Sequence, residues 1–169
     1  MIMTHIESGA TIDDTGTYRY ALWRTWDAVK PRMLWIMLNP STADGKSDDP
    51  TIRRCVGFAH AWGYGGIDVA NLYALRATDP RDLRQAQVDP VGPDNDTFIK
   101  AAAMQSAEVV CGWGAHSIAA PRVRRVCGLL DDAWMIPQCL GVKKEGHPRH
   151  PLYVPAVTLL EPFTKMVAL

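Results

Sequence analysis

The stretch Met33–Ser41, MLWIMLNPS, decides the predicted fold of this chain. Its first six residues, Met33–Leu38, are all apolar, which is typical of a strand covered on both faces, as in a parallel sheet. Asn39, Pro40 and Ser41 then end the strand, because these residues favour turns. The stretch therefore predicts a buried strand that carries small polar groups to the edge of a sheet.

Further apolar runs alternate along the chain with segments of helical spacing. The other expected strands are Tyr18–Trp26, Ile67–Tyr73, Val109–Gly112 and Met135–Val142. Helices are expected after Asp49-Pro50, from Asp94 or Asn95 to about Ala107, and after Pro121, where Arg122, Arg124 and Arg125 should face solvent. The alternation predicts an α/β protein with three α/β/α layers. Its central, mainly parallel sheet should have about four core strands plus an N-terminal edge strand or hairpin.

Size, charge and cysteine content narrow the class of protein. The 169 residues suit one domain over 1–169, and 18 basic against 18 acidic residues argue against a tight, non-specific binder of duplex DNA. Four cysteines without CxxC spacing predict buried free thiols in a reducing cytosol. Met1–Gly9 lacks the apolar core of a signal peptide, and no apolar run approaches the roughly 20 residues that span a bilayer. We expect a cytoplasmic protein with no membrane partner.

Polar motifs follow four of the expected strands. They are Asn39–Asp49, Asn71–Arg84, Trp113–Ser117 and His147–His150. In open α/β sheets, ligands bind outside the carboxyl ends of the parallel strands. The four motifs are therefore predicted to meet on one rim and to form a ligand site there.

The first motif combines turn chemistry with groups that suit catalysis. Asn39 can both donate and accept hydrogen bonds, so it can orient an attacking water. Asp44 can act as a base if burial raises its pKa. Pro40, Ser41 and Thr42 would contribute to ligand binding, although such residues also favour plain turns. Asp49 has two interpretations, a helix cap and a ligand contact.

The second motif places a polar side chain inside an apolar strand. Asn71 is costly to bury unless it is hydrogen-bonded, so it either pins a neighbouring loop or contacts the ligand. Arg76 lies just beyond it, and with Arg81 and Arg84 it can meet a phosphate or remain a solvated surface residue.

The last two motifs supply an aromatic ring and imidazoles. Trp113 either stacks on a base or packs in the core, and His116 can contact a ligand or a carboxylate. Either His147 or His150 can hydrogen-bond a ligand carbonyl or a developing negative charge. The pattern lacks the third ligand that a metal pair would require, so we predict neither a metal nor a cofactor.

The motifs also resemble those of a known family. LWRTW, MLNPSTAD, DDPTIRRC, VANLYALRATDP, CGWGAH and GHPRHPLY extend over nearly the whole chain. On these motifs the chain is identified as a member of the bacterial and phage domain-of-unknown-function family 1643. That resemblance implies no reaction.

The order of the motifs is similar to that of the uracil-DNA glycosylase superfamily, and the resemblance implies a related fold and site. Asn39-Pro40 resembles the Asn-Pro with which some members position the attacking water. Asn71 with Arg76 resembles the Asn and downstream Arg of the next strand, and Gly112–Ala115 resembles a glycine-containing strand end. His150-Pro151 or His147-Pro148 resembles the His-Pro motif that contacts the base.

The chain departs from this superfamily at particular positions. Met37 and Leu38 stand where a glycine is usual, and Leu152 or Arg149 replaces the usual serine after His-Pro. The cysteine spacing of the iron–sulfur members is also missing. These departures extend the possible substrates to an altered base or a free nucleotide.

Three functions are compatible with the sequence. The first is an enzyme of the DNA glycosylase type, in which Asn39 positions the water and Asp44 acts as the base. His150 or His147 would stabilise charge on the departing nucleobase, and Trp113 would stack on it. Its partner would be a nucleotide, a nucleobase or a single-stranded nucleic acid. The second is a non-catalytic nucleotide or nucleic-acid binding module. The third is another hydrolase or transferase on the same fold. The absence of a GxSxG motif argues against an α/β-hydrolase, and the absence of P-loop and GxGxxG motifs argues against an NTPase and a Rossmann dehydrogenase.

Overall fold

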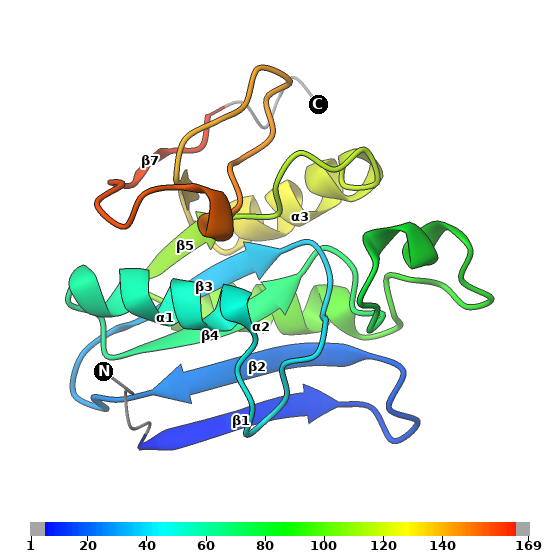
Figure 1. Ribbon diagram of the computed structural model, residues 1–169, viewed down its shortest axis with the longest axis horizontal. Coiled ribbons are helices and arrows are strands. Elements are labelled where there is room, and N and C mark those ends of the chain that lie inside the picture. The colour runs from blue at the N-terminus through cyan, green and yellow to red at the C-terminus, as the bar shows by residue number, and fades with distance from the viewer. Residues whose placement is uncertain (1–5, 165–169) are drawn as a thin grey trace.

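The computed structural model describes residues 6–164. Within this range the chain forms one sheet of seven strands in the order β1-β2-β4-β3-β5-β6-β7 (Figure 1). The strands are β1 (Glu7–Ile12), β2 (Arg19–Thr25), β3 (Arg32–Met37), β4 (Gly66–Asn71), β5 (Glu108–Cys111), β6 (Gln138–Cys139) and β7 (Glu161–Pro162). The helices are α1 (Pro50–Ala61), α2 (Asn95–Gln105) and α3 (Ala120–Asp132), with short 3-10 turns η1 (Pro80–Arg84) and η2 (Pro151–Tyr153). The prediction of an α/β protein is confirmed.

The sheet is larger and more mixed than predicted. The pairs β3–β4, β3–β5 and β5–β6 are parallel. The pairs β1–β2, β2–β4 and β6–β7 are antiparallel. The strand β7 has no apolar pattern, because Glu161 and Pro162 are both exposed, and the predicted strand Met135–Val142 is reduced to two paired residues.

Helices cover both faces of the sheet, and β3 shows why. Side chains of a strand alternate between faces. Met33 and Trp35 pack in the cluster that includes Ile52 and Val56 of α1. Leu34 and Ile36 pack in the opposite cluster, together with residues of α2 and α3. An uninterrupted apolar run is therefore needed at this central strand, as the sequence indicated.

Helix α1 begins as the sequence predicts. The Asp49 side chain accepts a hydrogen bond from the backbone N–H of Ile52 at 2.9 Å, and Pro50 occupies the first turn. Helix α2 begins differently: Asp94 makes no side-chain cap, and Asn95 is fully buried. The Nδ2 of Asn95 instead donates to the carbonyl of Asn71 at 3.0 Å. Asn95 therefore ties α2 to the end of β4.

Helix α3 corrects one expectation. Arg122 does not face solvent: it is 8% exposed, and its Nε donates to the carbonyl of Leu72 at 2.9 Å. Its Nη2 contacts Asp96 of α2 at 2.6 Å, and Arg125 reaches the same carboxylate at 2.7 Å. The burial of Arg122 follows from a carboxylate on a neighbouring helix, which helical periodicity does not reveal.

Antiparallel pairing brings the start of β2 to the rim. The carboxyl end of β4 lies beside the amino end of β2, and the backbone N–H of Arg19 donates to the carbonyl of Ala74 at 2.9 Å. Arg19 therefore joins the residues that follow the parallel strands. The prediction of buried thiols is confirmed: Cys55, Cys111, Cys127 and Cys139 are buried and form no disulfide bond. Over residues 6–164, no helix has the length and apolar character that crossing a membrane requires.

Candidate functional site

A cavity of about 380 Å³ opens at the carboxyl rim of the central strands. This volume lies in the range of about 300–1,000 Å³ that is typical of small-ligand sites. Its polar wall consists of Arg19, Asn39, Ser41, Asp49, Thr51, Asn71, Thr78, His116, Lys143 and His150. Leu38, Ile52, Trp113 and Tyr153 are among its apolar and aromatic lining residues. We call this space the rim cavity.

The rim cavity collects several of the predicted site residues. Asn39, Ser41, Asp49, Asn71, Trp113, His116 and His150 line it. They come from segments that follow β3, β4, β5 and β6, as expected for an α/β rim. Pro40, Thr42, Asp44, Arg76 and His147 do not line it.

Asn71 is the most unusual residue of the rim cavity. It ends β4 and is 2% exposed, and neither Nδ2 nor Oδ1 of its side chain has a hydrogen-bond partner. Buried carboxamides are nearly always satisfied, because an unpaired one loses water without replacement. The pinning role that the sequence left open for Asn71 belongs to the side chain of Asn95. The free carboxamide is instead suited to a ligand.

Asn39 is held rigidly by its amide nitrogen. Nδ2 donates to the carbonyl of Pro40 at 3.0 Å and to the carbonyl of Ala77 at 2.8 Å. Both hydrogens are thereby used, and among the described residues no hydrogen bond engages Oδ1. Asn39 therefore offers an oriented acceptor to a water or a ligand.

His150 presents a donor in its neutral form. Its Nδ1 accepts the backbone N–H of Leu152 at 3.3 Å, which leaves the ring hydrogen on Nε2. Burial lowers the pKa of His150 below its ordinary value, and the nearby carboxylate of Asp49 only partly opposes this. The ring also lies 5.5 Å from that of Tyr153, centroid to centroid.

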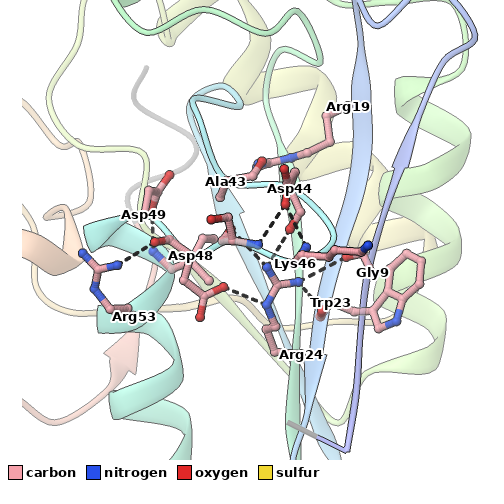
Figure 2. A network of polar contacts seen from close by, with 12 residues as sticks. Gly9, Arg19, Trp23, Arg24, Ala43, Asp44, Lys46, Asp48, Asp49 and Arg53 are labelled. Atoms are coloured by element: carbon pink, nitrogen blue, oxygen red, sulfur yellow. Dashed lines mark hydrogen bonds and ion pairs between the residues drawn. The ribbon is translucent and has the colours of Figure 1, made fainter. Parts of the chain in front are cut away.

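Asp49 is the helix cap that the sequence offered as one interpretation, and its contact with a ligand stays a prediction. One carboxylate oxygen, Oδ1, caps α1 through Ile52, and the residue also lines the rim cavity. Burial lowers the pKa of His150 and of Arg19, and the negative charge of Asp49 partly opposes both shifts. Figure 2 shows Asp49 next to the loop that follows β3.

Asp44 lacks the raised pKa that the predicted role as a catalytic base requires. Its Oδ1 accepts the backbone N–H groups of Lys46 and Ser47, each at 2.8 Å (Figure 2). These hydrogen bonds lower the pKa of Asp44 rather than raise it. The carboxylate closes a tight turn outside the rim cavity, and a carboxylate stabilised in this way is a weak proton acceptor.

Trp113 packs as a core residue at the cavity wall. It is 2% exposed, and its ring meets Phe163 edge to face at 5.5 Å between centroids. Its indole Nε1 is buried without a hydrogen-bond partner, as is Nδ1 of His116. Two residues that line the rim cavity thus carry further buried polar atoms without a hydrogen-bond partner.

The two histidines of GHPRHPLY separate in space. His150 lines the rim cavity, whereas His147 lines a second, open cavity of about 640 Å³ with Lys143, Lys144 and Arg149. His147 is 8% exposed, and burial lowers its pKa. The structure therefore associates His150, and not His147, with Asn39 and Asn71.

The remaining predicted residues have local contacts. The carbonyl of Pro40 accepts hydrogen bonds from Asn39 and from the backbone of Ala77, and Thr42 is exposed. Arg76 donates from Nη1 to the carbonyl of Gly16 at 3.1 Å. Among residues 6–164, no group of three or more His, Cys, Asp or Glu side chains is placed to hold a metal ion.

Arg19 is a cavity residue that the sequence analysis missed. It is 3% exposed, its Nη1 donates to the carbonyl of Ala43 at 2.6 Å, and its Nε has no partner. Burial lowers the pKa of Arg19 to about 10, although the charge of Asp49 opposes this. The sequence shows an arginine at the start of a predicted strand, but only the pairing of β2 with β4 places Arg19 at the rim cavity.

Comparisons with known proteins identify a family and no reaction. The family model described as "Protein of unknown function (DUF1643)" matches residues 19–152. No curated protein and no solved structure matches the chain. The matched range contains every lining residue discussed above except Tyr153.

Proposed function

We propose, from the premise that the chain belongs to this family of proteins of unknown function, that it is an enzyme acting on a nucleobase or nucleotide. The rim cavity would hold the base, and the reaction would be hydrolysis of the N-glycosidic bond or modification of the base. The uracil-DNA glycosylase likeness of the motifs supports this assignment, since Asn39, Asn71 and His150 all line one cavity.

The single observation that carries the proposal is the unsatisfied carboxamide of Asn71. A carboxamide offers one donor and one acceptor side by side. The keto bases uracil, hypoxanthine and xanthine present the complementary pair, a ring N–H next to a carbonyl. Such a base would satisfy both atoms of Asn71 at once, whereas an apolar ligand of the same size would satisfy neither.

The other cavity residues suit the steps of hydrolysis. The bond between C1′ of the sugar and the ring nitrogen breaks, and its electron pair leaves with the base. Oδ1 of Asn39 orients a water whose oxygen bonds to C1′, and the carboxylate of Asp49 receives the proton. The Nε2–H of His150 donates to the base oxygen on which negative charge develops. A neutral imidazole suffices for this, which agrees with its lowered pKa.

Product analysis tests the proposal directly. The protein is incubated with nucleosides, nucleotides and single- or double-stranded oligonucleotides that carry uracil, hypoxanthine, xanthine or modified pyrimidines, and mass spectrometry detects any released or altered base. We expect product from at least one keto base, and its loss in Asn39→Ala. Thr42→Ala is the matched control, because Thr42 lies three residues away but outside the cavity.

Asn71→Leu separates recognition from folding. Leucine has a similar volume and removes two polar atoms that have no partner, so the melting temperature should be unchanged or higher. Binding of the keto base should nevertheless be lost. A variant that binds and turns over the base as the wild type does would contradict the proposal.

A binding module without turnover is the second candidate. It is favoured by the position of Asp44, whose lowered pKa and place outside the cavity remove the base that the sequence suggested. Binding of a keto base that depends on Asn71, without product from any substrate, would select this second function.

A further inference from the structure

Arg19 places a full positive charge in the wall of the rim cavity. It is 3% exposed, and among residues 6–164 its one hydrogen-bonded side-chain contact is the donation from Nη1 to the carbonyl of Ala43. Its Nε is buried without a partner, and no ion pair within that range engages the guanidinium. Buried charges are normally paired, because removing them from water costs several kcal/mol. Arg19 departs from this rule.

The surroundings of Arg19 increase its need for an anion. The negative charges of Asp49 and Asp44 stabilise the positive charge of Arg19 without forming an ion pair with it. The positive charges of Arg76 and Arg24 destabilise it. Arg76 also has a buried Nε without a partner. Arg24, in contrast, is occupied with Asp48 and with backbone carbonyls, so it cannot serve a ligand.

We propose that Arg19 forms an anion subsite of the rim cavity, and that it receives the phosphate of a nucleotide. A guanidinium binds phosphate oxygens through charge-assisted hydrogen bonds, often two in parallel. The hydroxyls of Ser41, Thr51 and Thr78 line the same cavity and can add donors. This subsite deepens the proposed function, on which it rests, by making the substrate a nucleotide rather than a free base or a nucleoside.

The depth of Arg19 favours a terminal phosphate. An internal phosphodiester is joined to a nucleotide on each side, so the cavity would have to admit the strand in two directions. A terminal phosphate monoester is joined to one nucleotide and needs only one path into the protein. Arg19 as a residue is 3% exposed, so its side chain is difficult for a continuous strand to reach. The formal net charge of zero also gives the chain little general attraction for a polyanion.

Binding to the wild-type protein tests the subsite without any variant. Calorimetry compares uridine with uridine 5′-monophosphate, and inosine with inosine 5′-monophosphate. We expect each monophosphate to bind at least about tenfold more tightly than its nucleoside, which corresponds to one charge-assisted contact. Inorganic phosphate should raise the melting temperature and compete with the monophosphate but not with the nucleoside.

Substitution at Arg19 tests the residue itself. In Arg19→Gln the advantage of the monophosphate should disappear while nucleoside binding persists, and Arg19→Lys should retain part of it because the charge remains. Arg81→Gln is the matched control, because Arg81 is exposed and paired with Asp79 outside the cavity. If Arg19→Gln does not fold, the comparison of monophosphate with nucleoside on the wild-type protein still shows whether the cavity binds the phosphate.

The outcomes separate this inference from the proposed function. Equal affinity for nucleoside and monophosphate, or an advantage that survives in Arg19→Gln, would overturn the subsite. If an oligonucleotide with an internal keto base binds more tightly than the monophosphate, the inference that the bound phosphate is a terminal one is wrong. If phosphate binds through Arg19 but the base and Asn71 make no difference, the proposed function fails and the anion subsite stands.

Discussion

The guanidinium of Arg24 joins the β1–β2 hairpin to the loop that follows β3 (Figure 2). It is 1% exposed, and each of its five N–H groups has an acceptor. The acceptors are Oδ1 of Asp48 at 2.7 Å and the carbonyls of Trp23 at 2.8 Å, Asp44 at 2.6 Å, Gly9 at 3.3 Å and Ser47 at 3.3 Å. Arg24 thus contacts the loop that carries Ser41 and Asp49 to the rim cavity at three residues, Asp44, Ser47 and Asp48.

Removing this side chain should be costly. Arg24→Met removes the buried cation that contacts the carboxylate of Asp48 and the hydrogen bonds to four backbone carbonyls, and we expect the free energy of unfolding to fall by about 3 kcal/mol. Urea denaturation measures the change. Arg53→Met is the control: Arg53 is exposed and donates to the backbone carbonyl of Asp48, so its loss should cost about 0.5 kcal/mol or less. Similar midpoints for Arg24→Met and the wild type would show that the loop is stable without Arg24.

At the residue scale, the sequence best predicted the location of those site residues that directly follow a strand. Asn39 and Asn71 follow apolar runs directly, so the α/β rule places both at the rim. Asp44 could not be judged in this way, because its pKa depends on two backbone N–H groups that only the folded turn directs at it. Arg19 required the pairing of β2 with β4, which no local pattern encodes.

At the element scale, Asp49 combines the start of α1 with the cavity. Asparagine caps helices about as well as aspartate, so Asp49→Asn should leave the free energy of unfolding within a few tenths of a kcal/mol. Asp49→Ala should lower it by about 1 kcal/mol, because the N–H of Ile52 loses its acceptor. If Asp49 also receives the proton from water, Asp49→Asn should abolish turnover although the protein remains stable. Thermal unfolding and product analysis on both variants distinguish the two roles.

The connection between α1 and β4 depends on a residue without a side chain. A Cβ on Gly65 would lie 2.0 Å from the carbonyl oxygen of Asp27, and Gly65 also exchanges backbone hydrogen bonds with Trp26, Asp27 and Pro31. We expect Gly65→Ala to lower the free energy of unfolding by about 3 kcal/mol. The same substitution at Gly57 meets nothing within 4 Å and lies on the exposed side of α1, so it should raise stability by about 0.5–1 kcal/mol. Chemical denaturation of both variants checks the opposite signs.

Elements were predictable from the sequence where burial alone decides them. The strand β3 and the start of α1 have strong local signals, namely an apolar run and the Asp49-Pro50 cap. The side of α3 that faces solvent was wrongly predicted for Arg122, because Asp96 on another helix supplies its partner. The strand β7 has exposed residues and no alternation, so nothing in its composition marks it.

At the scale of the whole molecule, the order of elements was sufficient to predict the α/β class. Alternating strands and helices leave few topologies in which both faces of the central strands are covered. The sequence predicted an N-terminal edge strand or hairpin, but it did not reveal that β2 pairs with β4 or that β7 extends the sheet at the other side. This extension has a functional consequence, because the added strand β2 brings Arg19 to the rim cavity.

The burial of His147 and the partial burial of His150 are expected to make the stability of the whole molecule depend on pH near neutrality. Burial lowers the pKa of His147 and of His150 below 6.5, while Glu145 and Asp49 respectively oppose the shift. When the pH falls below 6.5, the unfolded chain therefore takes up protons that the folded chain does not. The stability that the neutral imidazoles contribute is fully present above pH 6.5 and is lost as the pH falls through their lowered pKa values.

Urea denaturation at intervals between pH 8 and pH 5 should show this loss. We expect the free energy of unfolding to be level above pH 7 and then to fall, with a slope of at most about 1.4 kcal/mol per pH unit for each histidine. The double variant His147→Gln, His150→Gln should flatten the curve in this window, and His60→Gln, at an exposed position of α1, should not. The lowered pKa values of Asp44 and Asp96 act in a separate window, because stability from a carboxylate is lost only as the pH falls below about 3.8. A double variant with the wild-type slope between pH 6.5 and pH 5 would assign the loss to other groups, and the neutral state of His150 on which the proposed reaction depends would then lack support.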